Sequence, residues 1–380
     1  MVSWDSSGLF DPFKKVVIDY IYHRTYYEAM RSFIRSLRYL LVFSLPLLTF
    51  VSFRSTGWFT FLPLIEAFVF IPLVELIIKP DISNVTEEEE KILKNAFIYD
   101  FWIYLASAFQ FALLIYFFIS MQDNGISLID SIGRITAMGL MCGIYGINVA
   151  HELGHRPERY HHWLAKGLLL TSMYMHFFIE HNRGHHRWVS TPKDPATSRR
   201  NESVFIFWIR SIVGSYRSAW KLEQERLTKQ SIHWLNWKNE MIQCHILQIG
   251  LLGLIFVVWG GLILLYFLCA AMVGILLLET VNYIEHYGLL RKKTKNDQYE
   301  RVLPKHSWNS DHLLGRLFLF ELSRHSDHHY LASRKYQILR HIDESPQMPT
   351  GYPGMILLSL MPPLWFYVMN RRLAQENAND

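Results

Sequence analysis

The chain has 380 residues, of which 51% are hydrophobic, 15% aromatic and only 19% charged, and its formal net charge is +5. Long apolar runs separated by short polar loops indicate a polytopic membrane protein and exclude a set of two or three soluble domains. The three cysteines, Cys142, Cys244 and Cys269, form no Cys-x-x-Cys pair, which excludes a disulfide framework, a zinc ribbon and a cysteine-bound iron site in this chain.

Six apolar runs are predicted to cross the membrane as helices. We expect residues 1–36 to form a cytoplasmic arm with an interfacial helix, and residues 37–380 to form one membrane-embedded domain. The uncharged run Ile246–Leu278 would make a helix of roughly 50 Å, longer than the roughly 30 Å hydrocarbon core, so we expect a break at Gly260-Gly261. The predicted spans are Leu37–Phe53, Trp58–Ile78, Phe101–Ile119, Ser127–Ala150, Met241–Val258 and Leu262–Val281.

Shorter signals predict how these spans are joined and packed. Thr86 and Glu89 fit a capping box that opens a short helix. Gly139 and Gly143 form a Gly-x-x-x-Gly pattern, which permits close contact between membrane helices. The apolar run Pro353–Met369 is broken by two prolines, and we interpret it as a buried or interfacial cap.

Nine of the 18 histidines fall in four motifs that are typical of a metal site. The motifs are His151-Glu152-Leu153-Gly154-His155, Glu180-His181-Asn182-Arg183-Gly184-His185-His186, Asn282-Tyr283-Ile284-Glu285-His286-Tyr287-Gly288 and Arg324-His325-Ser326-Asp327-His328-His329. On α-helices, His151 would align with His155, and His181 with His185, whereas His186 would be turned about 100° away. Imidazole is the commonest metal ligand, and nine exceed what one ion can bind, so we infer two metal ions.

The positions of the basic residues predict the orientation in the membrane. With the N-terminus inside, six spans place all four motifs on the cytoplasmic side. The loops assigned to the outside carry only Arg54, which satisfies the positive-inside rule. We expect the apolar run Trp163–Ile179 to lie along the cytoplasmic boundary, because a span there would separate the first two motifs.

Four functions are compatible with these residues. The first is a membrane diiron oxygenase or desaturase. The second is a zinc protease with Glu152 as general base of His-Glu-x-x-His, which leaves six clustered histidines unexplained. The third is a metal transporter, although its ligands should lie near the bilayer midplane rather than at helix ends. The fourth is a structural or partner-binding membrane protein.

The four motifs resemble those of the membrane-bound alkane 1-monooxygenases, which belong to the histidine-rich diiron group that includes membrane fatty-acid desaturases. The segment Asn282–Gly288 is the most specific, and Thr350-Gly351-Tyr352-Pro353-Gly354-Met355 and Pro362-Pro363-Leu364-Trp365 are similar to the C-terminal region of that family. The resemblance covers about residues 100–370. It implies an all-α membrane protein in which two iron ions and dioxygen convert the terminal methyl of an n-alkane to a primary alcohol.

The resemblance also implies the ligands and the partner. The implied iron ligands and catalytic residues are His151, His155, His181, His185, His186, His286, His325, His328 and His329. By analogy with desaturases, one iron would bind His151, His155, His181, His186 and His329, and the other the remaining four. Rubredoxin, reduced by a flavoprotein, would supply electrons to an enzyme of the bacterial inner membrane.

Two further sets of residues are predicted to serve this centre. Carboxylates that could orient ligating histidines are Glu152, Glu180, Asp194, Glu279, Glu285, Asp311 and Asp327. The chain has no Gly-x-Gly-x-x-Gly dinucleotide motif, so redox chemistry would need electrons from another protein. We expect basic residues near Arg291–Lys295 and Arg334–Arg340 to attract an acidic electron carrier.

Overall fold

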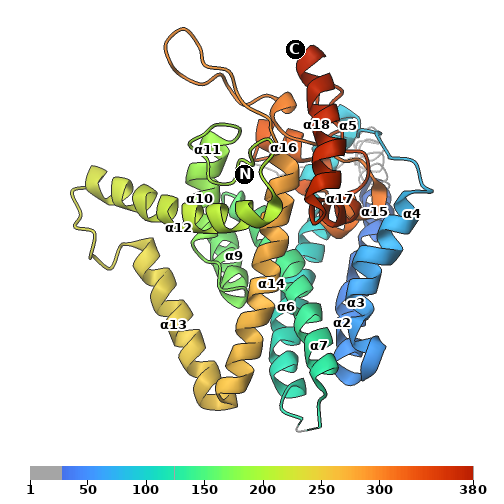
Figure 1. Ribbon diagram of the computed structural model, residues 1–380, viewed down its shortest axis with the longest axis vertical. Coiled ribbons are helices and arrows are strands. Elements are labelled where there is room, and N and C mark those ends of the chain that lie inside the picture. The colour runs from blue at the N-terminus through green and yellow to red at the C-terminus, as the bar shows by residue number, and fades with distance from the viewer. Residues whose placement is uncertain (1–27, 124, 380) are drawn as a thin grey trace, which may run out of the picture.

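The structure is a computed structural model that describes residues 28–123 and 125–379, and within these residues it is helical and contains no β-strand. Six helices are long and apolar enough to cross a membrane, and they form a bundle (Figure 1). They are Glu28–Arg54, Gly57–Glu75, Phe97–Ser120, Leu128–Gly154, Glu240–Trp259 and Gly261–His286. All six predicted spans are therefore confirmed. The predicted boundary at residue 36 lies inside the first helix, and most of the predicted arm lies outside the described residues.

Several of the long helices are built from shorter pieces with different windings. The first contains η1 (Leu37–Phe43) and α2 (Ser44–Arg54), and the third, fifth and sixth are α6 (Phe97–Ser120), α13 (Glu240–Trp259) and α14 (Gly261–His286). The second consists of η2 (Gly57–Phe61), α3 (Leu62–Ile65), the π-helical η3 (Glu66–Phe70) and α4 (Ile71–Glu75). The fourth consists of α7 (Leu128–Met141), the π-helical η4 (Cys142–Asn148) and α8 (Val149–Gly154). The break at Gly260, with φ of +86°, separates α13 from α14 as expected.

The remaining helices connect the spans, and most of them gather at one end of the bundle (Figure 1). They are α5 (Glu87–Asn95), α9 (Arg159–Thr171), α10 (Phe177–Glu180), η5 (His181–His185), α11 (His186–Trp188), α12 (Val204–Lys229), η6 (Pro304–His306), α15 (Leu313–Phe318), α16 (His325–Tyr330), η7 (Tyr336–Ile338), α17 (Tyr352–Ser359) and α18 (Pro362–Asn379). Thr86 and Glu89 form the predicted capping box of α5. Neither α17 nor α18 is a membrane span, and Tyr352, Met355 and Trp365 are buried, in agreement with the predicted cap.

Small residues hold the fourth and sixth spans close together. A Cβ atom at Gly139 would collide with Val273, and one at Gly143 would lie 2.8 Å from Leu277 and 3.3 Å from the carbonyl oxygen of Gly274. The glycine pattern therefore has the predicted effect, because it brings the backbones of α14 and the fourth span into direct contact. This contact fixes where the C-terminal ends of both helices, which carry histidines, lie relative to each other.

The prediction for Trp163–Ile179 is confirmed in part. No membrane span forms there, but α9 runs alongside α6 instead of lying across the end of the bundle. Near the start of α9 the Tyr104 hydroxyl is 2.8 Å from His161 Nε2, and at its end Gln110 Nε2 donates to Thr171 Oγ1 over 2.9 Å. The physical reason is that polar groups of α6 and η4, including the Cys142 carbonyl that accepts from Ser172 Oγ, satisfy the buried end of α9.

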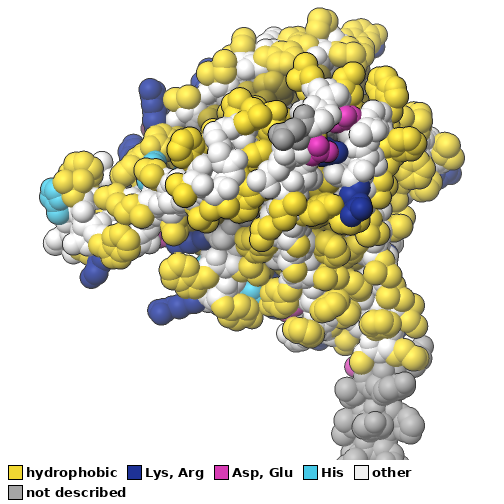
Figure 2. Space-filling model, turned by 90° about the horizontal axis from the view of Figure 1, so that it is seen from below, with side chains coloured by type: hydrophobic (Ala, Val, Ile, Leu, Met, Phe, Trp, Pro, Cys, Tyr) yellow, Lys and Arg dark blue, Asp and Glu magenta, His cyan; other side chains and the backbone are white. Residues whose placement is uncertain are grey.

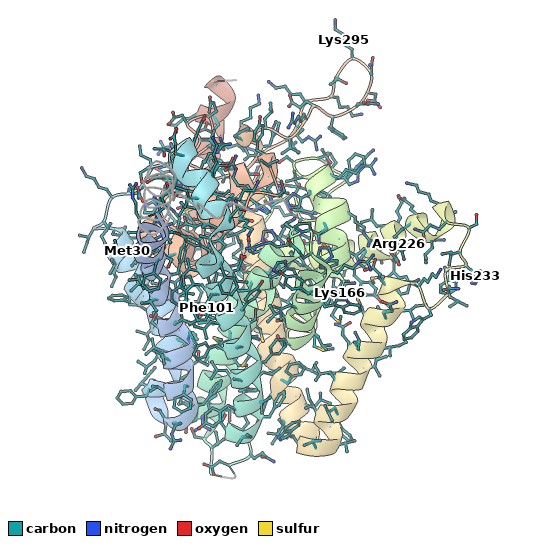
Figure 3. All side chains as sticks on the ribbon, turned by 180° about the vertical axis from the view of Figure 1, so that it is seen from behind. Met30, Phe101, Lys166, Arg226, His233 and Lys295 are labelled. Atoms are coloured by element: carbon teal, nitrogen blue, oxygen red, sulfur yellow. The ribbon has the colours of Figure 1, made fainter. Side chains whose placement is uncertain are left out.

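The outer surface of the bundle is apolar. Helix α12 extends sideways from the histidine-rich end, and α13 returns at a slant from its tip (Figure 1). Seen from the opposite end, the molecule shows mostly hydrophobic side chains (Figure 2). His233 lies at the outermost loop between α12 and α13, far from the helices that carry the four motifs (Figure 3). The architecture is that of an integral membrane protein whose polar, histidine-rich end is formed by the connecting helices.

Candidate metal centre

The nine histidines of the four motifs come together in two groups. Within each group, the ligand atoms lie within 4.8 Å of one another. The five-histidine group consists of His151, His155, His181, His186 and His328, and the four-histidine group of His185, His286, His325 and His329. Each group draws on several motifs, so all four motifs lie at the same end of the bundle, as the sequence predicted.

The spacing of the nitrogen atoms fits metal coordination. In the five-histidine group, successive Nε2 atoms are 3.0 Å apart for His181 and His186 and 3.2 Å for His155 and His181. In the four-histidine group, the His185 and His329 Nε2 atoms are 3.2 Å apart. Two neighbouring ligands that each lie about 2.1 Å from one ion are about 3.0–3.4 Å apart. The imidazoles therefore converge on two common points.

The second motif divides between the groups because its backbone is π-helical. The sequence predicted that His181 aligns with His185, but His181 shares a group with His186, and His185 belongs to the other group. The segment η5 is a π-helix, in which residues five apart occupy equivalent positions. The 3.6-residue period of an α-helix did not give this division, whereas the analogy with desaturases, which placed His181 with His186 and His185 in the other group, agrees with it.

The predicted division of the last motif is wrong in one exchange. His328, not His329, completes the five-histidine group, and His329 lies in the four-histidine group with His325. Helix α16 is a regular α-helix, so residues four apart face the same way. The analogy with desaturases exchanged these two residues, and helical spacing alone does not decide between them, because residues three and four apart both lie near one face.

Burial disfavours the charged form of the ligand imidazoles outside the spans. Burial, reinforced by the neighbouring imidazoles, holds the pKa of His181, His186 and His328 well below its usual range. His185 differs: burial opposes its charge, but the Asp194 carboxylate beside it outweighs this and raises its pKa. A neutral imidazole offers a lone pair on one nitrogen, which is the form that binds a metal.

Two of the seven candidate carboxylates contact a ligand imidazole. Asp194 Oδ2 lies 3.0 Å from Nδ1 of His185, which fixes the proton on Nδ1 and leaves Nε2 to face His329. Glu285 Oε2 lies 3.2 Å from Nε2 of His325. The other five have different partners: Glu152 with Arg156, Glu180 with Ser218, Glu279 with Tyr174, Asp311 with Arg324 and Asp327 with Arg340.

The contacts of Glu152 argue against a protease. A general base in His-Glu-x-x-His must face the water on the metal. Glu152 Oε1 instead accepts hydrogen bonds from Arg156, and it lies 3.5 Å from the backbone nitrogen of Tyr336. The carboxylate therefore joins α8 to the segment that follows α16, and no general base of that type is in place.

An apolar cleft is lined in part by α14, the helix that ends at His286 of the four-histidine group. Its cavity volume is about 50 Å³, and it is lined by Leu45, Ala67, Phe68, Ile71, Leu140, Ile144, Leu277, Val281, Gly315, Phe318, Leu319, Tyr352, Pro353 and Ile356. Val281 precedes His286 by five residues, or roughly 7.5 Å along the helix axis. The Tyr352 hydroxyl donates to Glu285 Oε1 over 2.8 Å. The sequence marked the segment of Tyr352 but gave no role to the residue.

The basic residues predicted to bind an electron carrier differ in whether they are already paired within the chain. Arg334 is paired with Glu90, Arg340 is paired with Asp327, and the Arg291 guanidinium donates to the carbonyl oxygens of Glu300 and Arg187. Lys295 lies at the tip of the loop that projects furthest from the bundle (Figure 3). Lys295 is exposed there, and the neighbouring Lys293 is paired with Asp297, whereas Arg334 and Arg340 are paired with carboxylates at the histidine-rich end.

Known proteins share the sequence of this region. A family model described as fatty acid desaturase matches residues 132–359. The chain is 38% identical to the alkane 1-monooxygenase of Acinetobacter baylyi, over 82% of this chain and 76% of the relative. It is 38% identical to alkane 1-monooxygenase 1 of Alcanivorax borkumensis, over 87% and 82%, and 44% identical to alkane 1-monooxygenase 2 of Pseudomonas aeruginosa, over 66% and 67%.

Proposed function

The chain belongs to the alkane 1-monooxygenases, within the fatty acid desaturase family, and from this premise we propose that it hydroxylates the terminal methyl of n-alkanes with dioxygen at a histidine-bound diiron centre. The observation that carries the proposal is the pair of convergent histidine groups beside an apolar cleft. The overall reaction consumes one alkane, one dioxygen, two electrons and two protons, and yields one primary alcohol and one water.

The donor set fits two iron ions. Imidazole nitrogen suits iron, zinc and copper alike, but a single catalytic zinc needs only three protein ligands. Two groups of five and four convergent nitrogens favour two ions that undergo redox chemistry. Iron bound there would supply dioxygen activation and the oxidation of an unactivated carbon–hydrogen bond.

The residues of the chain position the substrate and keep water away. An n-alkane has no polar group, so it is bound only by apolar burial, worth about 0.8 kcal/mol for each methylene group. The cleft between α14, α17 and the second span offers such burial, and Tyr352 lies on its wall. We infer that an alkane bound along α14 presents its terminal methyl group to the histidines at the end of this helix.

Asp194 fixes the orientation of His185 in the four-histidine group. Its Oδ1 accepts from the backbone N–H of Ala196 and its Oδ2 accepts from the hydroxyl of Thr197, so the carboxylate has a fixed orientation when it contacts His185. A carboxylate fixed in this way keeps the imidazole ring and its tautomer fixed as well.

Electron supply and orientation belong to the same proposal. Because the chain has no cysteine pair and no dinucleotide motif, we infer an external one-electron carrier, rubredoxin, reduced by a flavoprotein. The loops at the end opposite the histidines, within residues 55–56, 121–127 and 260, contain no Lys or Arg. This charge bias supports a cytoplasmic metal centre in the bacterial inner membrane.

Metal analysis with histidine variants tests the proposal. Purified protein should contain two irons, and His286→Ala should abolish turnover of an n-alkane while the protein stays folded. His162→Ala is the matched control, because the His162 ring contacts the Arg156 carbonyl and is in neither group. One zinc and little iron in active protein would refute the diiron centre.

A further inference from the structure

We propose that α12 lies in the interface of the bilayer, with one apolar face inserted among the lipids at the histidine-rich end. The partner of this face is the phospholipid bilayer itself. Helix α12 has 26 residues, long enough to cross a membrane, yet it is not among the six helices that are apolar enough to do so. It extends sideways from the spans instead (Figure 1). The inference does not depend on the reaction or on the metal at the histidines.

The exposed surface of α12 is divided lengthwise into an apolar and a charged sector. Five apolar side chains that are 39–71% exposed form the first sector, which we call the α12 stripe: Phe205, Ile206, Ile209, Val213 and Tyr216. Their spacing of three and four residues places them on one side of the helix. Arg217, Lys221 and Glu225 are exposed too and repeat every four residues beside the stripe. An apolar face next to a charged one is typical of helices that lie in a membrane interface.

The first end of α12 lies at the level where the sixth span leaves the hydrocarbon core. At 1.5 Å per residue, α14 is about 39 Å long, which exceeds the core of about 30 Å. Counted from Gly261, at the opposite end of the bundle, the core is crossed after about 20 residues, close to Thr280. The indole nitrogen of Trp208 donates to Thr280 Oγ1 over 3.0 Å. The start of α12 is therefore held at the membrane boundary.

The other end of α12 is held at the start of the fifth span. Glu223 Oε1 accepts from the backbone N–H of Glu240, the first residue of α13, over 2.7 Å. The loop that joins these two helices exposes Trp234, Leu235 and Trp237. Tryptophan is enriched at membrane–water interfaces. Because this loop directly precedes a span, both ends of α12 lie at the same boundary.

Lipid fits the α12 stripe better than a second protein does. The stripe ends at Tyr216, whose hydroxyl lies 2.9 Å from Nε2 of His245 on α13, so it is continuous with the outer surface of a membrane span. A stable protein interface takes roughly 20–30 residues from each partner, whereas the stripe has five. Interfacial helices bury such a face about 5–10 Å into the boundary between headgroups and acyl chains.

The opposite face of α12 supports the second histidine motif. Ser218 Oγ donates to Glu180 Oε1 over 3.3 Å, and the Arg183 guanidinium donates to Glu223 Oε2 over 2.9 Å. Both Glu180 and Arg183 belong to that motif. A helix that contacts lipid on one face and this motif on the other sets the distance of the motif from the hydrocarbon core.

Spin-label depth measurements on the full-length protein test the interface. The protein is placed in nanodiscs of equal parts phosphatidylcholine and phosphatidylglycerol. In a Cys269→Ser background, Cys142 and Cys244 are buried, so the label reports a single introduced cysteine. Labels on Ile209→Cys and Val213→Cys should collide with oxygen more often than with a water-soluble nickel chelate, at a depth of about 5–10 Å.

Controls on the same helix and on a span complete the test. Labels on Lys221→Cys and Glu225→Cys, in the charged sector, should collide more often with the nickel chelate. A label on Ile249→Cys, in the middle of α13 and 67% exposed, is the reference for contact with lipid. If the two stripe labels meet the nickel chelate as often as the charged-sector labels do, the inference is overturned. Stripe labels that are shielded from both reagents and broadened by a neighbouring label would show a second copy there and overturn it as well.

Discussion

Replacing Gly274 by alanine should disturb the metal centre without touching a histidine. Gly274 lies in the part of α14 that packs against η4. A Cβ atom there would lie 2.6 Å from Cys142 Cβ, 2.9 Å from the backbone nitrogen of Gly143 and 3.1 Å from the carbonyl carbon of Cys142. Two of these atoms are backbone, so no side-chain rotation relieves the overlap. The two helices must separate.

The size of the separation follows from these distances. Ordinary van der Waals contact begins at 3.4 Å, so α14 must move by about 0.8 Å relative to η4. Helix α14 ends at His286 and η4 continues into α8 with His151, so the shift changes the position of one histidine group relative to the other. A misplacement of about 1 Å costs roughly 100-fold in rate, and overpacking costs about 1–3 kcal/mol of stability.

Turnover of an n-alkane and thermal unfolding in nanodiscs measure both effects. The matched control is Gly250→Ala on α13, where nothing lies within 4 Å of the added Cβ. The control should keep wild-type turnover and be as stable or slightly more stable, because alanine favours the helix. If Gly274→Ala and Gly250→Ala behave alike in both assays, the close contact does not position the metal centre.

The remaining predictions concern the metal, the membrane and the electron carrier. His328→Ala should weaken one metal equivalent and His329→Ala the other, and isothermal titration that finds both acting on the same equivalent would contradict the two groups. Removal of metal with a chelator should lower the melting temperature, since an ion present at 100 times its Kd contributes about 2.7 kcal/mol. A cysteine at Asp123 should react with an impermeant reagent from outside intact cells, and one at Lys295 should not. Lys295→Glu and added salt should both raise the KM for an acidic carrier while leaving kcat unchanged; a KM insensitive to both would remove the projecting loop from the docking surface.

The spans and the set of nine histidines were predictable because their signals are local. Apolar length identifies a membrane helix, and the Gly260-Gly261 pair marks the natural break in the run Ile246–Leu278. The histidine motifs predicted a shared site, since the predicted topology placed all four segments on the same side of the membrane. That His151 and His155 occur in one group follows directly from their spacing of four residues.

The division of the histidines was not predictable from helical periodicity, because it depends on helical winding. The analogy with desaturases gave all of it except the exchange of His328 and His329. Nothing in the residues His181–His185 indicates a π-helix, and that winding decides which of His185 and His186 joins His181. The path of α9 depends on partners distant in sequence, such as Gln110, whose amide reaches Thr171. The contact of Glu285 with His325 likewise joins residues 40 positions apart. The motif suggested Glu285 as a candidate, but the fold determines which histidine it contacts.

Labelled dioxygen tests the central claim most directly. Purified, iron-loaded protein should be supplied with a medium-chain n-alkane, a reduced electron carrier and ¹⁸O₂, and the products should be identified by mass spectrometry. The account predicts the 1-alcohol as the main product, with its oxygen derived from ¹⁸O₂. An alkene as the main product would indicate a desaturase, and an alcohol that carries oxygen from water would contradict dioxygen insertion at this centre.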